Sequence, residues 1–174
     1  LPSHLTAEEI VLTGKYKSSI LYAPYGQEEL DQAREMLASI GGQDLIGRSY
    51  ISLSQGEKQL LLIARSLMEE PELLILDEAT SGLDLFARER LLNQIKKITQ
   101  MDQAPTILYV THHVEEITAA MDHVLLLKEG ETIAQGPKED ILQKEVMDRF
   151  YPQPVELIEL GEDRYFVKVE VRSS

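Results

Sequence analysis

The feature that most constrains the fold is a short apolar run at residues 73–76 (LLIL) that ends in two acidic residues, Asp77 and Glu78. A run of this length predicts a β-strand buried on both faces, as in a parallel sheet. Ligands of open α/β sheets bind beyond the carboxyl ends of the strands, so the two acids are expected at a ligand site. One carboxylate suits a metal such as Mg²⁺, and its neighbour can accept a proton from water. The alternative interpretation is two solvated acids after a strand.

A second feature, Ser54 and Glu57, begins a helix twenty residues earlier in the chain. The two residues form an S-x-x-E capping box, in which each side chain satisfies a free backbone N–H. Gly56 leaves the backbone amides of the first turn open, and a helix N-terminus attracts anions. A capped helix without a ligand is the alternative.

The remaining pattern alternates helices and strands, which predicts an α/β fold. Pro105 precedes a second buried strand, Glu129-Gly130 joins two strands of an antiparallel hairpin, and residues 151–174 add a β-rich extension read as a further hairpin. Helices are predicted from Thr6 and Ser54 and over residues 28–40, 85–101, 114–121 and 138–150. Strands are predicted over residues 73–76, 106–110, 123–127, 131–135, 155–160 and 165–171.

Four motifs in this order resemble the ATP-binding cassette family. Residues 53–57 (LSQGE) resemble its signature motif, usually LSGGQ, with Gln55 in place of a glycine and Glu57 in place of the glutamine. Residues 73–78 resemble its Walker B strand with the catalytic glutamate, and residues 81–84 (SGLD) resemble its D-loop. Residues 110–113 (VTHH) resemble its switch-histidine segment, with His112 at the switch position.

The resemblance implies an ATPase subunit of a membrane transporter, with ATP and Mg²⁺ bound between two ATPase subunits. It implies Glu78 and His112 as catalytic residues and Asp77 as the Mg²⁺ ligand. In the family the signature binds the γ-phosphate of ATP held by the opposite subunit, and the D-loop links the subunits. The nucleotide-binding positions carried over in this way are Ser54, Gln55, Gly56, Glu57, Ser81 and Asp84.

One family motif is missing from the chain. No G-x-x-x-x-G-K-[ST] sequence occurs, because Gly14-Lys15 is followed by Tyr16 and position 9 is glutamate. The Q-loop is missing as well. We therefore expect a partial P-loop NTPase core that lacks its N-terminal P-loop part, is inactive alone, and leaves a sheet edge and apolar surface open to association. The expected divisions are a helical signature subdomain portion (1–52), the signature helix and C-terminal core (53–150), and the β-hairpin extension (151–174).

The amino-acid composition limits the classes of partner that the chain is expected to bind. The net charge is −13, from 17 basic and 30 acidic residues, which argues against a general nucleic-acid-binding surface. No apolar run approaches the roughly 20 residues of a membrane span, and the absence of cysteine fits a cytosolic protein. With the resemblance, this implies a peripheral subunit on the inner face of the cell membrane, bound to a transmembrane permease and a second ATPase subunit.

Two other functions stay open at this stage. Some family members act on ribosomes or DNA, although those usually carry two cassettes or long coiled-coil insertions. A non-catalytic interaction module is the other alternative. For that module, residues 16–25 and the acidic face of the chain would dock the partner. A basic-aromatic cluster in this stretch resembles by position the part of the family's helical subdomain that faces the membrane subunit, and an ordinary surface loop is the alternative; the cluster consists of Lys15, Tyr16, Lys17, Tyr22 and Tyr25.

Overall fold

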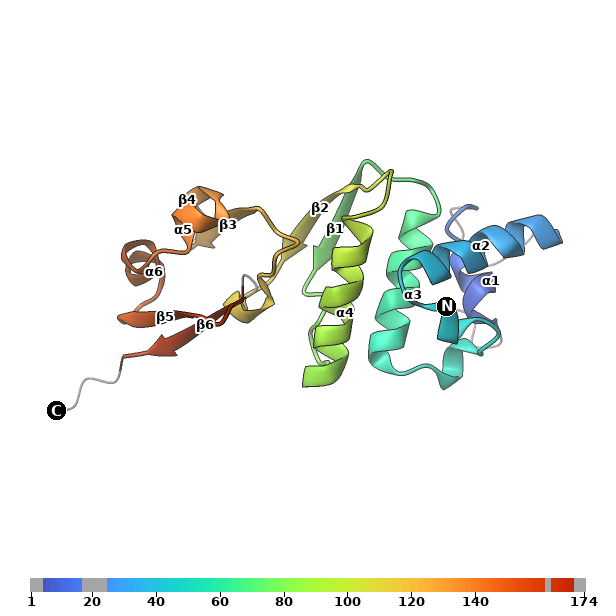
Figure 1. Cartoon of the computed structure of the whole chain (residues 1–174), viewed down its shortest axis with the longest axis horizontal. Helices are drawn as coiled ribbons and strands as arrows, with labels where there is room; N and C mark the ends of the chain where they lie inside the picture. Colours follow the sequence, from blue (N-terminus) through green and yellow to red (C-terminus); the bar gives the residue numbers. More distant parts are fainter. Residues whose placement is uncertain (1–4, 17–24, 162–163, 171–174) are drawn as a thin grey trace. The chain divides into compact units, whose positions relative to one another are not determined.

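The structure is a computed structural model that describes residues 5–16, 25–161 and 164–170. The chain divides into two compact units, residues 1–110 and residues 111–174 (Figure 1). Each unit has its own hydrophobic core. The domain boundaries predicted after residues 52 and 150 rest on sequence motifs, and they stay predictions. Among the described helices, none is long and apolar enough to cross a membrane.

The described part of the first unit is mainly helical. The helix predicted from Thr6 is confirmed, and the Thr6 N–H donates to the Glu9 carboxylate at 2.8 Å as a capping box requires. The helix predicted over residues 28–40 is also confirmed, and the chain turns after it at Gly41, where φ is +82°. The helices are α1 (Ala7–Leu12), α2 (Gln27–Ser39), α3 (Gln55–Leu67) and α4 (Leu85–Ile98), with 3-10 turns η1 (Gln43–Leu45) and η2 (Tyr50–Ser52).

Two strands of the first unit pair in parallel, as predicted. β1 (Leu73–Asp77) and β2 (Thr106–Val110) run in register from Leu73 opposite Thr106 to Asp77 opposite Val110. Helix α4 forms the crossover between them, which a parallel pair requires (Figure 1). Because the strands are parallel, the acids after β1 and the segment after β2 leave the sheet at the same edge.

One face of this strand pair builds the core of the first unit. Leu74 and Leu76 of β1 are buried in one cluster with Leu61 of α3 and with Leu91 and Ile95 of α4. Burying such a side chain contributes about 1.5–3 kcal/mol. This packing fixes α3 and α4 against the strands, and so fixes where their N-termini lie.

The opposite face of the pair is exposed, so the prediction of a strand buried on both faces is wrong for this chain. Leu73 and Ile75 of β1 are 52% and 57% exposed, and Leu108 and Val110 of β2 are 47% and 43% exposed. Buried and exposed residues alternate along β1 because the described helices of this unit pack only against the face that carries Leu74 and Leu76. The sequence run is apolar throughout, but only alternate residues meet a covering layer.

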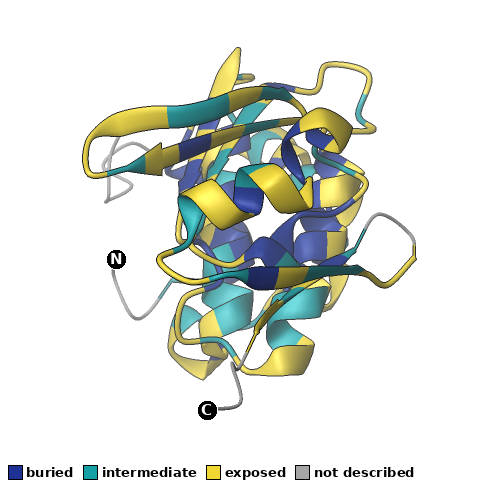
Figure 2. Ribbon diagram, turned by 90° about the vertical axis from the view of Figure 1, so that its left-hand side faces the viewer, coloured by how far each residue is buried: buried dark blue, intermediate teal, exposed yellow. Residues whose placement is uncertain are grey.

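The second unit is built from two hairpins and short helices. The turn at Glu129 and Gly130 has φ of +53° and +81°, which matches a tight hairpin turn and confirms that prediction. In Figure 2 the hairpin strands of this unit carry exposed and more buried residues along their length. Its elements are η3 (Val114–Glu116), β3 (His123–Lys128), β4 (Glu131–Pro137), α5 (Lys138–Ile141), α6 (Lys144–Phe150), β5 (Val155–Glu159) and β6 (Tyr165–Val169).

Two helices of the second unit differ from prediction. The helix expected over residues 114–121 is a single 3-10 turn, η3, because Ile117 already has an extended backbone at φ −71° and ψ 123°. The helix expected over residues 138–150 is split, since Leu142 and Gln143 leave helical geometry between α5 and α6. The break lets Leu142 and Met147 pack into one core cluster.

The C-terminal extension forms the predicted antiparallel hairpin. β5 and β6 pair from Val155 opposite Val169 to Glu159 opposite Tyr165. Val155 and Tyr165 are buried in the core of the second unit. The two strands of the extension are therefore part of this unit's core.

Candidate functional site

The N-terminus of α3 has the capping box that the sequence predicts. The Ser54 N–H donates to a Glu57 carboxylate oxygen at 2.7 Å, and the Glu57 N–H donates to Ser54 Oγ at 3.3 Å. Ser54 and Gln55 are exposed, and Gly56 is half-buried. Ser54 and Gln55 at the start of α3 are therefore open to solvent, and a helix N-terminus of this kind can receive an anion.

The two acids after the apolar run occupy the carboxyl end of β1, and both are exposed. Glu78 has a φ of +45°, a left-handed conformation that costs free energy for a residue with a side chain. The conformation is held in place because the Glu78 N–H donates to the Val110 carbonyl of β2 at 2.9 Å. Strained residues of this kind cluster at functional sites. Glu70 has a similar φ of +48°, but Glu78 also lies at the carboxyl end of a parallel strand, which makes it a candidate for chemistry.

The segment after Glu78 is a tight polar turn that leads into α4. The Ser81 N–H donates to the Glu78 carbonyl at 2.9 Å, and Gly82 takes a φ of +73°. Asp84 is the N-cap of α4, since its carboxylate accepts the Ala87 N–H at 2.9 Å. Ser81 and Asp84 are exposed.

The N-termini of α3 and α4 lie next to each other. A methyl group placed on Gly56 would lie 3.3 Å from the Ala87 side chain and 3.9 Å from that of Leu83. Each helix end carries unsatisfied N–H groups and a partial positive charge. The structure thus brings the signature-like segment and the D-loop-like turn into contact, directly after the acids that end β1.

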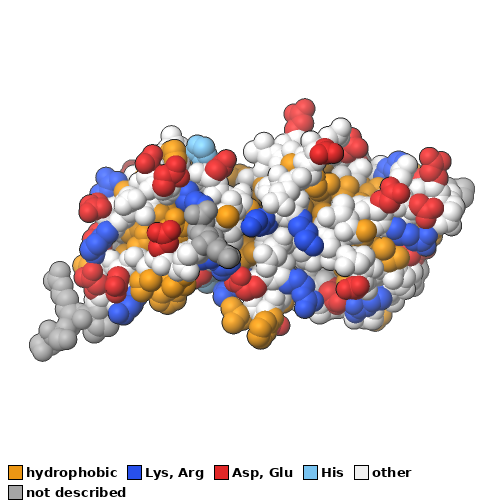
Figure 3. Space-filling model, in the orientation of Figure 1, with side chains coloured by type: hydrophobic (Ala, Val, Ile, Leu, Met, Phe, Trp, Pro, Cys, Tyr) orange, Lys and Arg blue, Asp and Glu red, His pale blue; other side chains and the backbone are white. Residues whose placement is uncertain are grey.

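Beside this region the chain exposes large apolar side chains. Leu85 and Phe86, in the first turn of α4, are 57% and 80% exposed. Figure 3 shows hydrophobic side chains protruding at the lower end of α4, while basic and acidic side chains are interspersed over the same face of the molecule.

His112 lies in the second unit, two residues after the end of β2. It is exposed, and its ring centroid lies 3.9 Å from that of His113. The segment is held by a buried acid: Thr111 Oγ1 donates to the Glu116 carboxylate at 2.6 Å and accepts the His113 N–H at 3.0 Å. Glu116 is only 1% exposed, so this network sets the backbone on both sides of His112.

Sequence reasoning missed Arg48, a residue that contacts the capped end of α3. Arg48 donates to both carboxylate oxygens of Glu57, at 2.5 and 3.3 Å. Burial raises the pKa of Glu57, but the hydrogen bonds from Arg48 and Ser54 outweigh it and hold that pKa below its ordinary value. Arg48 lies nine residues before its partner, outside the reach of helix-spacing rules. Glu116 was missed as well, and its position five residues after Thr111 gave no signal.

A metal site is not preassembled from carboxylates. Within residues 5–16, 25–161 and 164–170, no three His, Cys, Asp or Glu side chains are grouped so that they could hold a metal. Mg²⁺ is usually bound by one or two carboxylates together with waters and substrate phosphates. The exposed Asp77 at the strand end fits that kind of ligand set, and its role stays a prediction.

The basic-aromatic cluster is partly described. Lys15 donates to Gln32 at 3.0 Å, and Tyr16 donates to Glu29 at 2.9 Å, so both side chains are joined to α2. The hydroxyl of Tyr25 donates to Glu9. Lys17 and Tyr22 lie outside the described residues.

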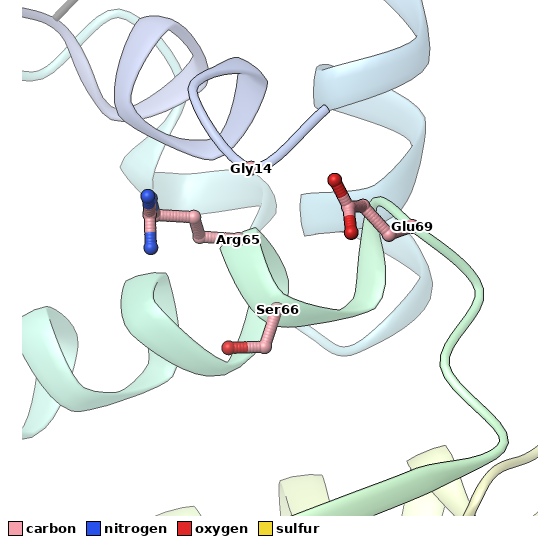
Figure 4. Close-up of a pocket in the computed structure, with 4 residues that line it drawn as sticks. All are labelled: Gly14, Arg65, Ser66 and Glu69. Carbon is pink, nitrogen blue, oxygen red and sulfur yellow. The ribbon is translucent and has the colours of Figure 1, made fainter. Parts of the chain in front are cut away.

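A hollow of about 210 Å³ lies at the opposite end of α3 from its capped N-terminus. It is lined by Gly14, Arg65, Ser66 and Glu69 (Figure 4). It contains none of the candidate site residues predicted from the sequence, and Ser54 and Gln55 at the N-terminus of α3 are exposed.

Comparison with known proteins shows which family the chain resembles. A family model described as ABC transporter matches residues 1–81. An ABC transporter ATP-binding protein of Streptococcus mutans is 64% identical over 171 residues, which is 98% of this chain and 66% of that protein. An uncharacterized ABC transporter ATP-binding protein of Lactococcus lactis is 54% identical over 164 residues, which is 94% of this chain and 63% of that protein. The chain thus spans a little under two thirds of the length of these relatives.

Solved structures resemble the fold over almost the whole chain. A metal-chelate type ABC transporter in an inward-facing conformation matches with a TM-score of 0.80 and 26% identity, covering 99% of this chain and 70% of the other. An ATP-binding cassette in its ADP conformation matches with a TM-score of 0.70 and 22% identity, covering 84% and 60%. These matches confirm the predicted α/β class and the P-loop NTPase type of core.

Proposed function

This chain belongs to the ATP-binding cassette (ABC) family, and we propose from this that the protein is the ATP-hydrolysing subunit of an ABC transporter. In that role it couples ATP hydrolysis to the transport of a solute across a membrane. The observation that supports this most directly is the contact between the N-termini of α3 and α4, next to two exposed carboxylates at the end of β1. Such a surface suits a polyanion with a bound cation.

The two carboxylates have different proposed roles. Asp77 holds Mg²⁺ through its exposed carboxylate, and the cation, when bound, neutralises charge on the phosphates. Glu78 polarises the attacking water and accepts its proton. The left-handed backbone at Glu78 and its hydrogen bond to β2 support this assignment, because they fix the backbone from which the carboxylate projects.

The capped helix end and the turn act across a dimer of ATPase subunits. Ser54 and Gly56 contact the γ-phosphate of ATP held by the second subunit, and the neighbouring Gln55 and Glu57 complete the segment. Ser81 and Asp84 join the subunits at the same place. The proposal draws support from the exposure of this surface and from the apolar side chains of Leu85 and Phe86 beside it.

His112 contacts the γ-phosphate and helps to position the attacking water. The buried Glu116 and Thr111 support this role, because they fix the backbone around an exposed imidazole. Phosphoryl transfer needs positioning and charge stabilisation above all. A histidine on a fixed segment supplies both.

Partners and location follow from the same proposal. The protein binds a transmembrane permease and a second ATPase subunit, and it works at the cytoplasmic face of the membrane. The 174-residue chain by itself neither binds MgATP well nor hydrolyses it, since it contains no P-loop sequence to cradle the phosphates.

The test is ATP hydrolysis by the protein at the full length of its relatives, with Glu78→Gln beside the wild type. We expect Glu78→Gln to lower kcat by at least about 100-fold, which is the usual contribution of a general base, while MgATP still binds. Glu129→Gln is the matched control, because Glu129 is also exposed and also has a positive φ, of +53°, but lies in a hairpin turn. Unchanged hydrolysis by Glu78→Gln would remove the proposed role. Co-purification with a membrane subunit distinguishes transport from a ribosomal or DNA-linked function.

A further inference from the structure

The ion pair between Arg48 and Glu57 joins a loop to the first turn of α3. The guanidinium of Arg48 donates to both oxygens of the Glu57 carboxylate, at 2.5 and 3.3 Å, and also to the Ser52 carbonyl at 3.2 Å. The side chains are 38% and 23% exposed, respectively. A two-pronged contact of this kind fixes direction as well as charge, which a lysine cannot do equally well.

The carboxylate that Arg48 holds is the one that closes the helix end. An oxygen of Glu57 accepts the Ser54 N–H at 2.7 Å, and the Glu57 N–H donates to Ser54 Oγ at 3.3 Å. Arg48, Glu57 and Ser54 therefore form one connected network. A change in the position of Arg48 would reach Ser54 through a single residue.

Arg48 is itself anchored by its backbone. Its carbonyl accepts the Ala7 N–H of α1 at 2.9 Å, and its own N–H donates to the Leu45 carbonyl at 3.0 Å. The preceding Gly47 donates its N–H at 2.8 Å to the carboxylate of Glu8, a residue that is 4% exposed. The guanidinium thus projects from a fixed loop and not from a free one.

The charge of Glu57 is a difficulty for the proposed phosphate contact. A carboxylate in the first turn of α3 satisfies the helix end but repels an incoming phosphate, and repulsion between like charges acts over several ångströms. The adjacent guanidinium cancels this charge. We propose that Arg48 is a positioning residue of the ATPase, which neutralises Glu57 and fixes the turn at residues 54–57 so that a nucleotide phosphate can approach it. This inference rests on the proposed function and deepens it.

The test is a double-mutant cycle in ATP hydrolysis by the protein at the full length of its relatives. At low ionic strength, Arg48→Met is expected to raise the KM for MgATP about tenfold and to leave kcat within about twofold, because the unpaired carboxylate opposes phosphate binding. In the Glu57→Gln background the same Arg48→Met change is expected to alter KM by less than about twofold, since no charge is left to neutralise.

Three comparisons separate this role from a merely structural one. The effect of Arg48→Met should shrink as salt is raised, because screening weakens repulsion between exposed charges. Arg48→Lys, which keeps the charge but loses the two-pronged contact, should bring the KM part of the way back toward the wild-type value even if Arg48→Met melts at a lower temperature. Arg149→Met removes a positive charge from an exposed site on α6 and should leave KM unchanged.

Two results would overturn the inference. One is an Arg48→Met effect of equal size with Glu57 and with Gln at position 57, which would mean that Arg48 acts independently of the carboxylate. The other is a wild-type KM in Arg48→Met at low salt. A wild-type protein that does not hydrolyse MgATP at all would instead contradict the proposed function, so the two failures are distinguishable.

Discussion

Replacing Gly14 with alanine should destabilise the contact between α1 and α3. Gly14 lies two residues after the end of α1, and a methyl group added to it would lie 2.0 Å from the Arg65 carbonyl oxygen and 3.0 Å from the Arg65 carbonyl carbon. Both are backbone atoms of α3, and the side chain of Arg65 lines the hollow beside them (Figure 4). Gly14 is not among the glycines with positive φ, so alanine has no backbone strain of its own there. The whole cost is steric.

The size of the effect can be worked out from this distance. Carbon and oxygen atoms approach to about 3.3 Å even in close contacts, so the two helices must separate by roughly 1 Å. That separation loosens side chains of α1 and α3 that are fully buried, such as Ile10 and Leu61. Overpacking of this kind costs about 1–3 kcal/mol, and a backbone-to-backbone clash belongs at the upper end. For a protein of this size, about 3 kcal/mol lowers the Tm by roughly 6–12 °C.

Thermal unfolding followed by circular dichroism measures the effect, in the protein at the full length of its relatives. Gly26→Ala is the matched control, because a methyl group there would meet only a flexible carboxylate of Glu29 at 3.2 Å. We expect the control to change stability by no more than about 1 kcal/mol. If Gly14→Ala melted within 2 °C of the wild type, roughly the shift from less than 1 kcal/mol, the packing of α1 on α3 described above would be refuted.

The other predictions concern the capped helix, its titration, the switch segment and the exposed sheet face. Ser54→Ala should lower the free energy of unfolding by about 1 kcal/mol in urea titrations, because the Glu57 N–H loses its acceptor. Burial raises the pKa of Glu57, but its hydrogen bonds outweigh burial and hold the folded-state pKa below the ordinary value of 4.5. The ionised carboxylate therefore stabilises the fold above that pH, and this contribution is lost as the pH falls through the folded-state pKa. Glu57→Gln should flatten the acid side of a Tm-against-pH curve. Glu116→Ala should cost about 1–3 kcal/mol in the same urea titrations and should reduce ATP hydrolysis, because Thr111 loses its buried acceptor. Ile75→Lys should shift the 174-residue chain toward monomer in size-exclusion chromatography, as it breaks the apolar sheet face; a wild-type chain that stays monomeric at all concentrations would contradict this.

Local sequence patterns predicted the elements of the site well. The S-x-x-E pattern at Ser54 depends on groups within one helical turn, and the structure contains that capping box. The apolar run before Asp77 and the run before Thr111 are both strands, and their parallel pairing follows from the helix between them. The turn at Glu129-Gly130 has few backbone alternatives, so it too could be predicted.

What failed depends on contacts between distant parts of the chain. An apolar residue such as Ile75 gives no local sign of whether a second layer covers it, and in the described structure its face is exposed. Residues 114–121 look helical by spacing, but the chain turns at Ile117, where η3 ends and buried side chains enter the second core. Helical periodicity does not predict the Arg48–Glu57 pair, because a loop and not a helix brings the two residues together.

The central proposal is that Asp77, Glu78 and the N-termini of α3 and α4 belong to an ATP site. That site also needs a P-loop to hold the phosphates. Calorimetric titration of MgATP into the protein at the full length of its relatives, with the 174-residue chain alongside, tests it most directly. We predict binding by the full-length protein and no measurable heat of binding from the 174-residue chain. Tight binding by the 174-residue chain alone would contradict the account, because its phosphates would then be held by groups other than those assigned here.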